Sequence, residues 1–157
     1  MNVLMLLKPK SEVDYLVDTY TLRQGIEKLR KHNFTAIPVL TKEGLYAGSV
    51  GEGDFLRFIV DNSDFADSMR KCETISIREI LRPDRNPSVT VNVQMRTLIE
   101  RAENQNFIPV TDDRGYFIGI VTRSTIIKTF CEHIEDDEDI VQPAVPYRPK
   151  AGVSVPS

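Results

Sequence analysis

The sequence has no tryptophan, only two cysteines and no long uninterrupted hydrophobic run. Cys72 and Cys131 form neither a Cys-x-x-Cys pair nor a metal-binding spacing, so we expect free thiols, a reducing compartment and no metal site. No apolar run approaches the roughly 20 residues of a membrane span, and the N-terminus lacks a basic region followed by a cleavage site. A formal net charge of −3 gives no overall attraction to nucleic acid or anionic membranes. These absences predict a cytoplasmic protein that binds neither nucleic acid nor membrane.

The clearest positive feature of the sequence is an internal repeat. Ile37-Pro38-Val39 recurs as Ile108-Pro109-Val110, and the same offset of 71 residues carries Gly44 onto Gly115. The segment before each copy also begins alike, with Asn-Phe at 33–34 and at 106–107. A duplication within 157 residues predicts two similar halves that pack face to face and bury one shared sheet interface, because each half alone has too little core to be stable.

Each half has the same order of expected elements: strand, helix, strand, strand, helix. In the first half Thr21 and Gln24 fit a helix capping box, and apolar residues follow at helical spacing. The two strands after this helix are separated by a turn in which Gly44 or Gly115 can adopt a positive φ. We expect the second helix of the first half to begin at Phe55. Between the halves, Ser76 and Glu79 predict a short capped helix.

The predicted fold class is therefore α+β, with two pseudo-symmetric β-α-β-β-α motifs packed face to face as one unit. The first motif is assigned to residues 1–72 and the second to residues 73–134. Residues 135–157 are an acidic run followed by a proline-rich stretch, a composition typical of a disordered tail.

With these blocks in place, the chain resembles a tandem pair of CBS domains, also called a Bateman module. The resemblance covers residues 1–134 and depends on the duplicated Pro-Val strands and on the hairpins that end at Gly48-Ser49-Val50-Gly51 and Gly119-Ile120-Val121-Thr122. The short second copy is also similar to small two-CBS proteins of Gram-positive bacteria, some of which bind cyclic di-AMP. The resemblance implies a regulatory module that binds an adenosine-type nucleotide (AMP, ADP, ATP, S-adenosylmethionine or cyclic di-AMP) between its halves. It also implies a homodimer.

The family motif places a Thr or Ser near the phosphate and, three residues later, an Asp on the ribose. The first copy has Gly51 in place of the hydroxyl but keeps Asp54, whereas the second keeps Thr122 but has Thr125 in place of the carboxylate. Neither motif is complete. One composite site, divided between a ribose side at Asp54 and a phosphate side near Arg123, is the hypothesis that this pattern favours.

Each candidate residue also has a structural interpretation. Asp54 could cap the helix expected at Phe55, and glycines at 51 and 53 could form a tight turn instead of a phosphate-binding loop. Thr122, Arg123 and Ser124 form the best phosphate-binding set, since a guanidinium binds phosphate through two hydrogen bonds, but they could equally be a surface arginine beside capping residues. The residues expected near an adenine or at the cleft mouth are Val17, Ala36, Ile37, Pro38, Tyr46, Ile108, Pro109, Tyr116, Lys8, Lys10 and Arg82.

The leading hypothesis is a regulatory module that senses an adenine nucleotide and signals in trans to an unidentified protein target. The alternative is a dimerising scaffold whose degenerate sites bind no small ligand. We expect no enzymatic activity and no required cofactor, because the sequence has no supported catalytic arrangement of Ser, His, Cys or paired carboxylates.

Overall fold

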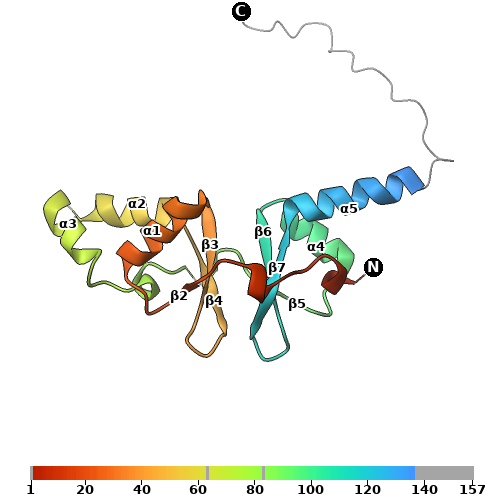
Figure 1. The fold of residues 1–157 in the computed structure, drawn as a ribbon, viewed down its shortest axis with the longest axis horizontal. Coiled ribbons are helices and arrows are strands. Elements are labelled where there is room, and N and C mark those ends of the chain that lie inside the picture. The colour runs from red at the N-terminus through yellow and green to blue at the C-terminus, as the bar shows by residue number, and fades with distance from the viewer. Residues whose placement is uncertain (1, 63, 83, 137–157) are drawn as a thin grey trace, which may run out of the picture.

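The computed structural model describes residues 2–62, 64–82 and 84–136 (Figure 1). Most of the tail predicted at 135–157 lies outside these residues. Among the described residues, no helix combines the length and the apolar composition needed to cross a membrane.

The two halves have the predicted order of elements. The first half contains β2 (Leu16–Val17), α1 (Leu22–His32), β3 (Ala36–Leu40), β4 (Tyr46–Gly51) and α2 (Glu52–Asp61). The second contains β5 (Val89–Thr90), α4 (Met95–Ala102), β6 (Phe107–Thr111), β7 (Phe117–Thr122) and α5 (Arg123–Asp136). The segments outside this repeat are η1 (Val3–Met5), β1 (Lys8–Pro9), η2 (Lys10–Glu12), α3 (Phe65–Lys71) and η3 (Ile77–Glu79). The expected mixed fold with two β-α-β-β-α motifs is confirmed.

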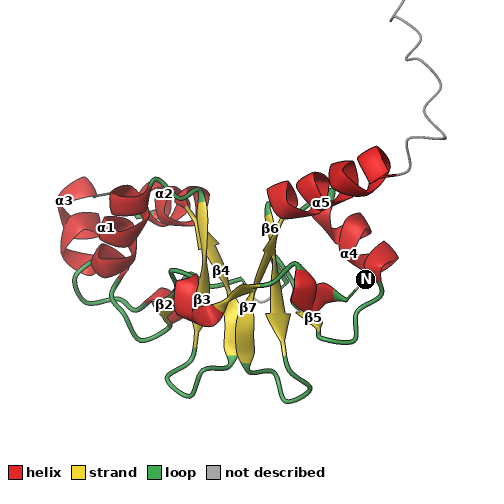
Figure 2. Cartoon of the chain, turned by 45° about the vertical axis from the view of Figure 1, so that its right-hand side comes forward, coloured by secondary structure: helices red, strands yellow, loops and turns green. Residues whose placement is uncertain are grey.

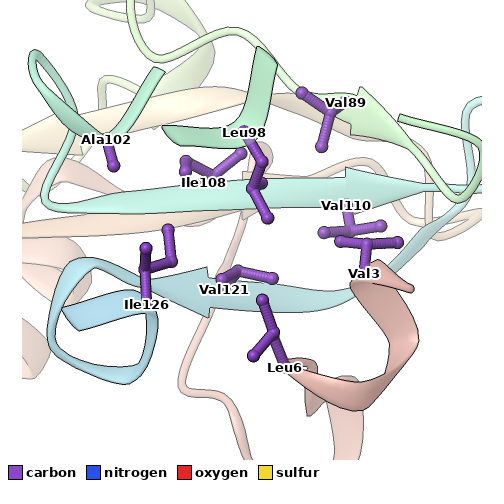
Figure 3. Packing of buried hydrophobic residues seen from close by; sticks show 9 residues of the cluster. All are labelled: Val3, Leu6, Val89, Leu98, Ala102, Ile108, Val110, Val121 and Ile126. Atoms are coloured by element: carbon purple, nitrogen blue, oxygen red, sulfur yellow. The ribbon is translucent and has the colours of Figure 1, made fainter. Parts of the chain in front are cut away.

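The strands form two sheets, one for each half. The first has the order β2-β3-β4 and the second the order β1-β7-β6-β5. Strand β1 comes from the start of the chain, yet Lys8 pairs with Ile120 and Pro9 with Gly119 in the second sheet. Val3 and Leu6 accordingly belong to the core of the second half (Figure 3). Residues 3–9 thus pack with the second half, although they fall within the segment assigned to the first motif.

Local sequence signals explain where the helices begin. The Thr21–Gln24 capping box at the start of α1 is present as predicted, with the Thr21 side chain accepting from the Gln24 N–H. Helix α2 begins at Glu52, so the expected start at Phe55 was wrong: Gly51 is the N-cap and Asp54 lies within the first turn. The predicted capped helix near Ser76 is a single 3₁₀ turn, and the Ser76 side chain makes no cap hydrogen bond.

The helices of each half cover the outer face of its own sheet, and the hairpins of the two halves meet (Figure 2). The Tyr46 N–H donates to the Gly115 carbonyl and the Phe117 N–H donates to the Gly44 carbonyl, both at 3.0 Å. Gly44 and Gly115 have φ values of 96° and 91°, as their turns require. A small cluster that contains Val13, Leu40 and Phe117 packs beside this junction. From there the two sheets diverge toward the helices (Figure 2).

Strand β1 depends on a close approach to Gly119. A Cβ atom at this position would lie 2.2 Å from the carbonyl oxygen of Lys8 and 2.9 Å from the Leu7 Cδ1 atom. We therefore expect Gly119→Ala to displace β1 and to lower the free energy of unfolding by about 2–4 kcal/mol. Urea unfolding followed by circular dichroism measures this change.

Gly53→Ala is the matched control. A Cβ atom at Gly53 would have no neighbour within 4 Å, and the residue lies inside α2. The free energy of unfolding of this variant should rise by about 0.5–1 kcal/mol, because alanine is more stable than glycine within a helix by this amount. Equal stability of the two variants would contradict the packing of β1 against β7.

Candidate functional site

Two clefts lie between the diverging sheets, and the internal repeat relates them. The larger, the Thr122 cleft, has a volume of about 300 Å³ and the smaller, the Gly51 cleft, about 140 Å³. The Thr122 cleft is lined by Lys8, Val13, Asp14, Asn33, Phe34, Thr35, Ala36, Ile37, Pro38, Asn106, Phe107, Ile120 and Thr122. The Gly51 cleft is lined by Ala36, Ser49, Val50, Gly51, Arg85, Asn86, Asn104, Gln105, Asn106 and Phe107. Ala36, Asn106 and Phe107 line both, so the two clefts are neighbours.

The walls of the Thr122 cleft are apolar, and its charged groups come from one segment. Pro38 from β3 and Ile120 from β7 line the cleft between the two sheets, whereas the side chain of Ile37, which is only 1% exposed, packs in the core of the first half. Strand β1 adds Lys8, and the segment that follows it, before β2, adds Asp14. One Asp14 oxygen lies 3.8 Å from Nδ1 of His32 at the end of α1. The cleft therefore offers a flat apolar slot with one cation and one carboxylate beside it.

The Thr122 side chain lies where β7 passes into α5. Its hydroxyl oxygen accepts from the Thr125 N–H at 3.2 Å, and it shares hydrogen bonds with the hydroxyls of Thr125 at 2.8 Å and Ser124 at 3.2 Å. Thr122 thus caps the first turn of α5 while also lining the cleft. Thr125, which stands at the position of the family's carboxylate, is half-buried and directs its hydroxyl to Thr122.

Arg123 follows Thr122 in the chain, but its guanidinium binds the C-terminal end of α4. Its Nε–H donates to the carbonyl of Ala102 at 2.8 Å, and its Nη2 atom donates to the carbonyl of Glu103 at 3.4 Å. A guanidinium at the C-terminal end of α4 satisfies carbonyl groups that the helix leaves without partners. Arg123 does not line either cleft. The structure therefore places the guanidinium on backbone carbonyls, in keeping with the structural interpretation.

Asp54 lies in the first turn of α2, and its side chain is only 2% exposed. The Gly51 N–H donates to Oδ2 at 2.8 Å, and Nη1 of Arg85 donates to Oδ1 at 2.8 Å. The guanidinium groups of Arg57 and Arg82 approach Oδ1 to 3.7 Å. Both oxygens of this buried carboxylate are therefore engaged within the chain. Asp54 is the third residue of α2, and its carboxylate accepts from the N–H of the N-cap residue, Gly51. It also binds arginine side chains, and the sequence did not indicate this second role.

Tyr46 connects β4 to the segment that leads into β5. Its hydroxyl donates to the Asn86 carbonyl at 2.7 Å and also bonds to the Ser49 hydroxyl at 2.8 Å. The Asn86 amide donates to Ser49 at 3.0 Å, and the Gln105 amide donates to the Asn86 side-chain oxygen at 2.6 Å. Burial raises the pKa of the Tyr46 phenol to about 12, although the hydrogen bond to Ser49 partly opposes this. Three members of this network, Ser49, Asn86 and Gln105, line the Gly51 cleft.

The other predicted site residues are spread over the fold. Val17 is half-buried in β2, opposite Leu40, and Ile108 is fully buried in the second core. Tyr116 is 39% exposed near the turn between β6 and β7. Gly53 lines a groove of about 470 Å³ between α1 and α2, outside both clefts. Pro109 pairs with Ile120 in the sheet, and Lys10 lies over the Tyr15 ring, 5.5 Å from its centre.

Sequence reasoning missed part of the cleft lining. Asn33-Phe34 and Asn106-Phe107 begin the two repeats, and this shared dipeptide was a signal that both segments face equivalent clefts. Asp14 and Arg85 had no comparable signal, because each lies in a connecting segment without a repeated counterpart of the same type. Among the described residues, no group of His, Cys, Asp and Glu side chains could hold a metal ion.

Comparison with known proteins identifies the class. Residues 9–61 and 76–132 match the CBS domain family, and the chain belongs to this family as a pair of CBS motifs. In sequence it is 24% identical to an uncharacterised protein of Methanocaldococcus jannaschii, over 66% of this chain and 77% of that protein. It is 31% identical to a homoserine O-acetyltransferase of Methanohalophilus mahii over 73% of this chain, but it spans only 22% of that enzyme's length.

Solved structures share the fold. CbpB in complex with c-di-AMP superposes with a TM-score of 0.80 at 22% identity, covering 88% of this chain and 90% of that chain. CbpB from Streptococcus agalactiae gives a TM-score of 0.77 at 22% identity, with coverage of 89% and 86%. CBSX2 in complex with AMP gives 0.66 at 19% identity, with coverage of 85% and 98%. The likeness confirms the predicted CBS-pair fold.

The buried Tyr46 hydroxyl has a measurable effect on stability. We expect Tyr46→Phe to cost about 1–2 kcal/mol at neutral pH, since Ser49 and the Asn86 carbonyl lose a partner. The raised pKa of Tyr46 means that its contribution is complete below about pH 10, the value for an unfolded tyrosine, and is lost as the pH rises toward 12. Wild-type stability should therefore fall more steeply than that of the variant between about pH 10 and about pH 12, measured by urea unfolding.

Tyr116→Phe serves as the control, because the Tyr116 side chain is exposed at the hairpin. This variant should keep the alkaline slope of the wild type. If Tyr46→Phe also kept that slope, the phenol would not be protected from ionisation by the fold.

Proposed function

We propose that the chain is a nucleotide-sensing module that binds an adenosine-type nucleotide in the Thr122 cleft. The observation that carries this proposal is the cleft itself, in which Thr122 at the start of α5 lies at the end of an apolar slot. Its volume of about 300 Å³ reaches the lower end of the range for small-molecule pockets. Complexes of CBS proteins of the same fold with c-di-AMP and with AMP support an adenine nucleotide as the ligand.

The chemistry of the cleft matches the parts of such a ligand. An adenine ring suits the slot between Pro38 and Ile120, since a planar base buries well against apolar side chains. A phosphate suits the Thr122 hydroxyl, the positive end of α5 and the ammonium of Lys8. The Asp14 carboxylate can accept hydrogen bonds from sugar hydroxyls or from an amino group, and Thr125 cannot supply a charge in its place. These roles make Asp14 the substitute for the carboxylate missing from the second motif.

Two substitutions test the nucleotide site. Lys8→Ala and Asp14→Asn should each weaken binding about tenfold or more, because a charged hydrogen bond contributes about 1.5–3 kcal/mol. The measurement is titration calorimetry against AMP, ATP, S-adenosylmethionine and cyclic di-AMP. The same panel in a thermal shift assay should show a raised melting temperature for each nucleotide that binds.

Lys42→Ala is the control, since Lys42 is exposed in the turn between β3 and β4 and does not line the cleft. Its affinities should equal those of the wild type. Absence of binding to every nucleotide at millimolar concentration would contradict the proposal and favour the scaffold function.

The second part of the proposal is a homodimer formed through the helices. Leu56 and Val60 on α2 are 62% and 70% exposed, and Ile127 and Phe130 on α5 are 57% and 59% exposed. The grooves beside them, between α1 and α2 and between α4 and α5, occupy equivalent places in the two halves. A second copy related by a two-fold axis can cover both apolar faces at once, because the repeat gives each face an equivalent on the other half. This helical surface would carry the ligand signal in trans to a protein target.

The dimer has its own test. Phe130→Glu should convert the dimer to a monomer, since a charge replaces an apolar side chain at the centre of the contact and remains unpaired there. Light scattering coupled to size-exclusion chromatography measures the mass. Met5→Glu, at a residue that is 77% exposed on η1, should leave the mass unchanged. A dimeric Phe130→Glu variant would place the dimer contact elsewhere.

A further inference from the structure

The two clefts differ most at the position where the family binds ribose. In the first motif the carboxylate is present as Asp54, but the side chain is 2% exposed and both oxygens already accept hydrogen bonds at 2.8 Å. A ribose diol needs a carboxylate oxygen that faces the cleft. The retained Asp54 is therefore no evidence by itself for a nucleotide beside Gly51.

Arg85 is the residue that occupies this carboxylate. It reaches Asp54 from the segment that runs beside β4, where the backbone of Arg82 forms an isolated antiparallel β-bridge with that of Ser49. The Arg85 guanidinium also passes close to Gly51, because a Cβ atom at Gly51 would lie 3.7 Å from its Nη2 atom. The same Cβ atom would lie 2.9 Å from the Thr35 carbonyl oxygen. A threonine in place of Gly51 would add further atoms where the backbone and this guanidinium already approach.

This packing links the two departures of the first motif from the family pattern. With no side chain at Gly51, the Thr35 carbonyl and the Arg85 guanidinium can both approach the backbone at the start of α2. Ser49, Asn86 and Gln105, which hydrogen bonds join to one another and to Tyr46, line the Gly51 cleft. The volume of the Gly51 cleft, about 140 Å³, is half that of the Thr122 cleft and below the usual range of ligand pockets.

We propose that Arg85 closes the Gly51 cleft by binding the Asp54 carboxylate, so that each chain has one nucleotide site, the Thr122 cleft. Asp54 is then a structural residue, and Arg85 determines how many ligands the chain binds. Arg57 and Arg82, which approach Asp54 without a hydrogen bond, keep the buried carboxylate compensated if Arg85 is removed. The count of one site rests on the proposed function, whereas the structural role of Asp54 does not.

The first experiment needs no nucleotide. Asp54→Asn keeps the shape of the side chain but removes the charge that binds Arg85, so its melting temperature should fall by roughly 5 °C or more. Arg85→Gln should lower the melting temperature similarly. The double variant Asp54→Asn/Arg85→Gln should lower it by less than the sum of the two single changes, since both changes remove the same ion pair. Additive changes would overturn the Asp54–Arg85 pairing whether or not any nucleotide binds.

The second experiment counts sites with AMP by titration calorimetry and equilibrium dialysis. The wild type should bind one AMP per chain, and Asp54→Asn should bind AMP with an affinity within twofold of the wild type. Arg85→Ala, or the double variant Arg82→Ala/Arg85→Ala, should bind two. The control is Arg78→Ala, because Arg78 forms hydrogen bonds at 2.9 and 3.1 Å to another buried carboxylate, Asp18, away from the clefts.

The outcomes separate the two proposals. Two AMP molecules per wild-type chain, a tenfold loss of affinity in Asp54→Asn, or a second site in Arg78→Ala would overturn the role of Arg85. The role of Arg85 would also be overturned if Arg85→Ala and the double variant Arg82→Ala/Arg85→Ala each bound only one AMP per chain. Absence of binding in every variant, together with non-additive melting temperatures, would reject the nucleotide site while leaving the Asp54–Arg85 pairing intact.

Discussion

The two hydrogen bonds that join the hairpin turns hold the rest of the architecture in place. They link Tyr46 to Gly115 and Phe117 to Gly44, and each is the pseudo-symmetric equivalent of the other. Because the sheets meet at this end and diverge toward the helices, the junction determines where a space can exist between them (Figure 2). Both clefts lie in that space, side by side, because Ala36, Asn106 and Phe107 line both of them.

Pseudo-symmetry of the backbone has not preserved symmetry of the side chains. At the start of α2 a glycine caps the helix and a buried aspartate closes the first turn from inside, whereas at the start of α5 a threonine does the capping. Both arrangements satisfy the N–H groups at a helix start. Only the second leaves the capping side chain at the surface of a cleft of useful size. The two motifs therefore satisfy the same N–H groups with different side chains, and their two clefts differ in size as a further consequence of unequal side chains.

The sequence was a good guide to the fold because its signals are local. The Thr21–Gln24 capping box, the glycines of the two turns and the duplicated Pro-Val strands each depend on residues close in the chain, and the structure contains all of them. The crossing of β1 into the second sheet depends instead on contacts between residues more than 100 positions apart, such as Lys8 with Ile120. Helix α3 was missed because Asp64, its N-cap, precedes only seven helical residues with no repeated counterpart.

The site was harder to predict for the same reason. The hypothesis of a divided site compared equivalent positions, and it drew attention to Asp54 and Thr122. It could not show that Arg85, in a connecting segment 31 residues beyond Asp54, engages that carboxylate. Nor could it show that Arg123 turns away toward the end of α4. Charged side chains on long, flexible stems can reach partners in many directions, so their neighbours follow from the tertiary structure and not from their spacing in the chain.

The position of Thr122 connects the cleft to the surface of the molecule. Its hydroxyl caps α5, and α5 carries the exposed Ile127 and Phe130 on the turns that follow. In the proposed complex, a phosphate bound at Thr122 would act on the same hydroxyl group that orders this first turn. Any difference in the position of α5 between the free and bound states then appears at the apolar helical face. By thermodynamic linkage, a partner that prefers one of these positions must in turn alter the affinity of the cleft for its ligand. The proposed sensor needs no catalytic group, because one helix would be shared between the ligand site and the surface that a partner would contact.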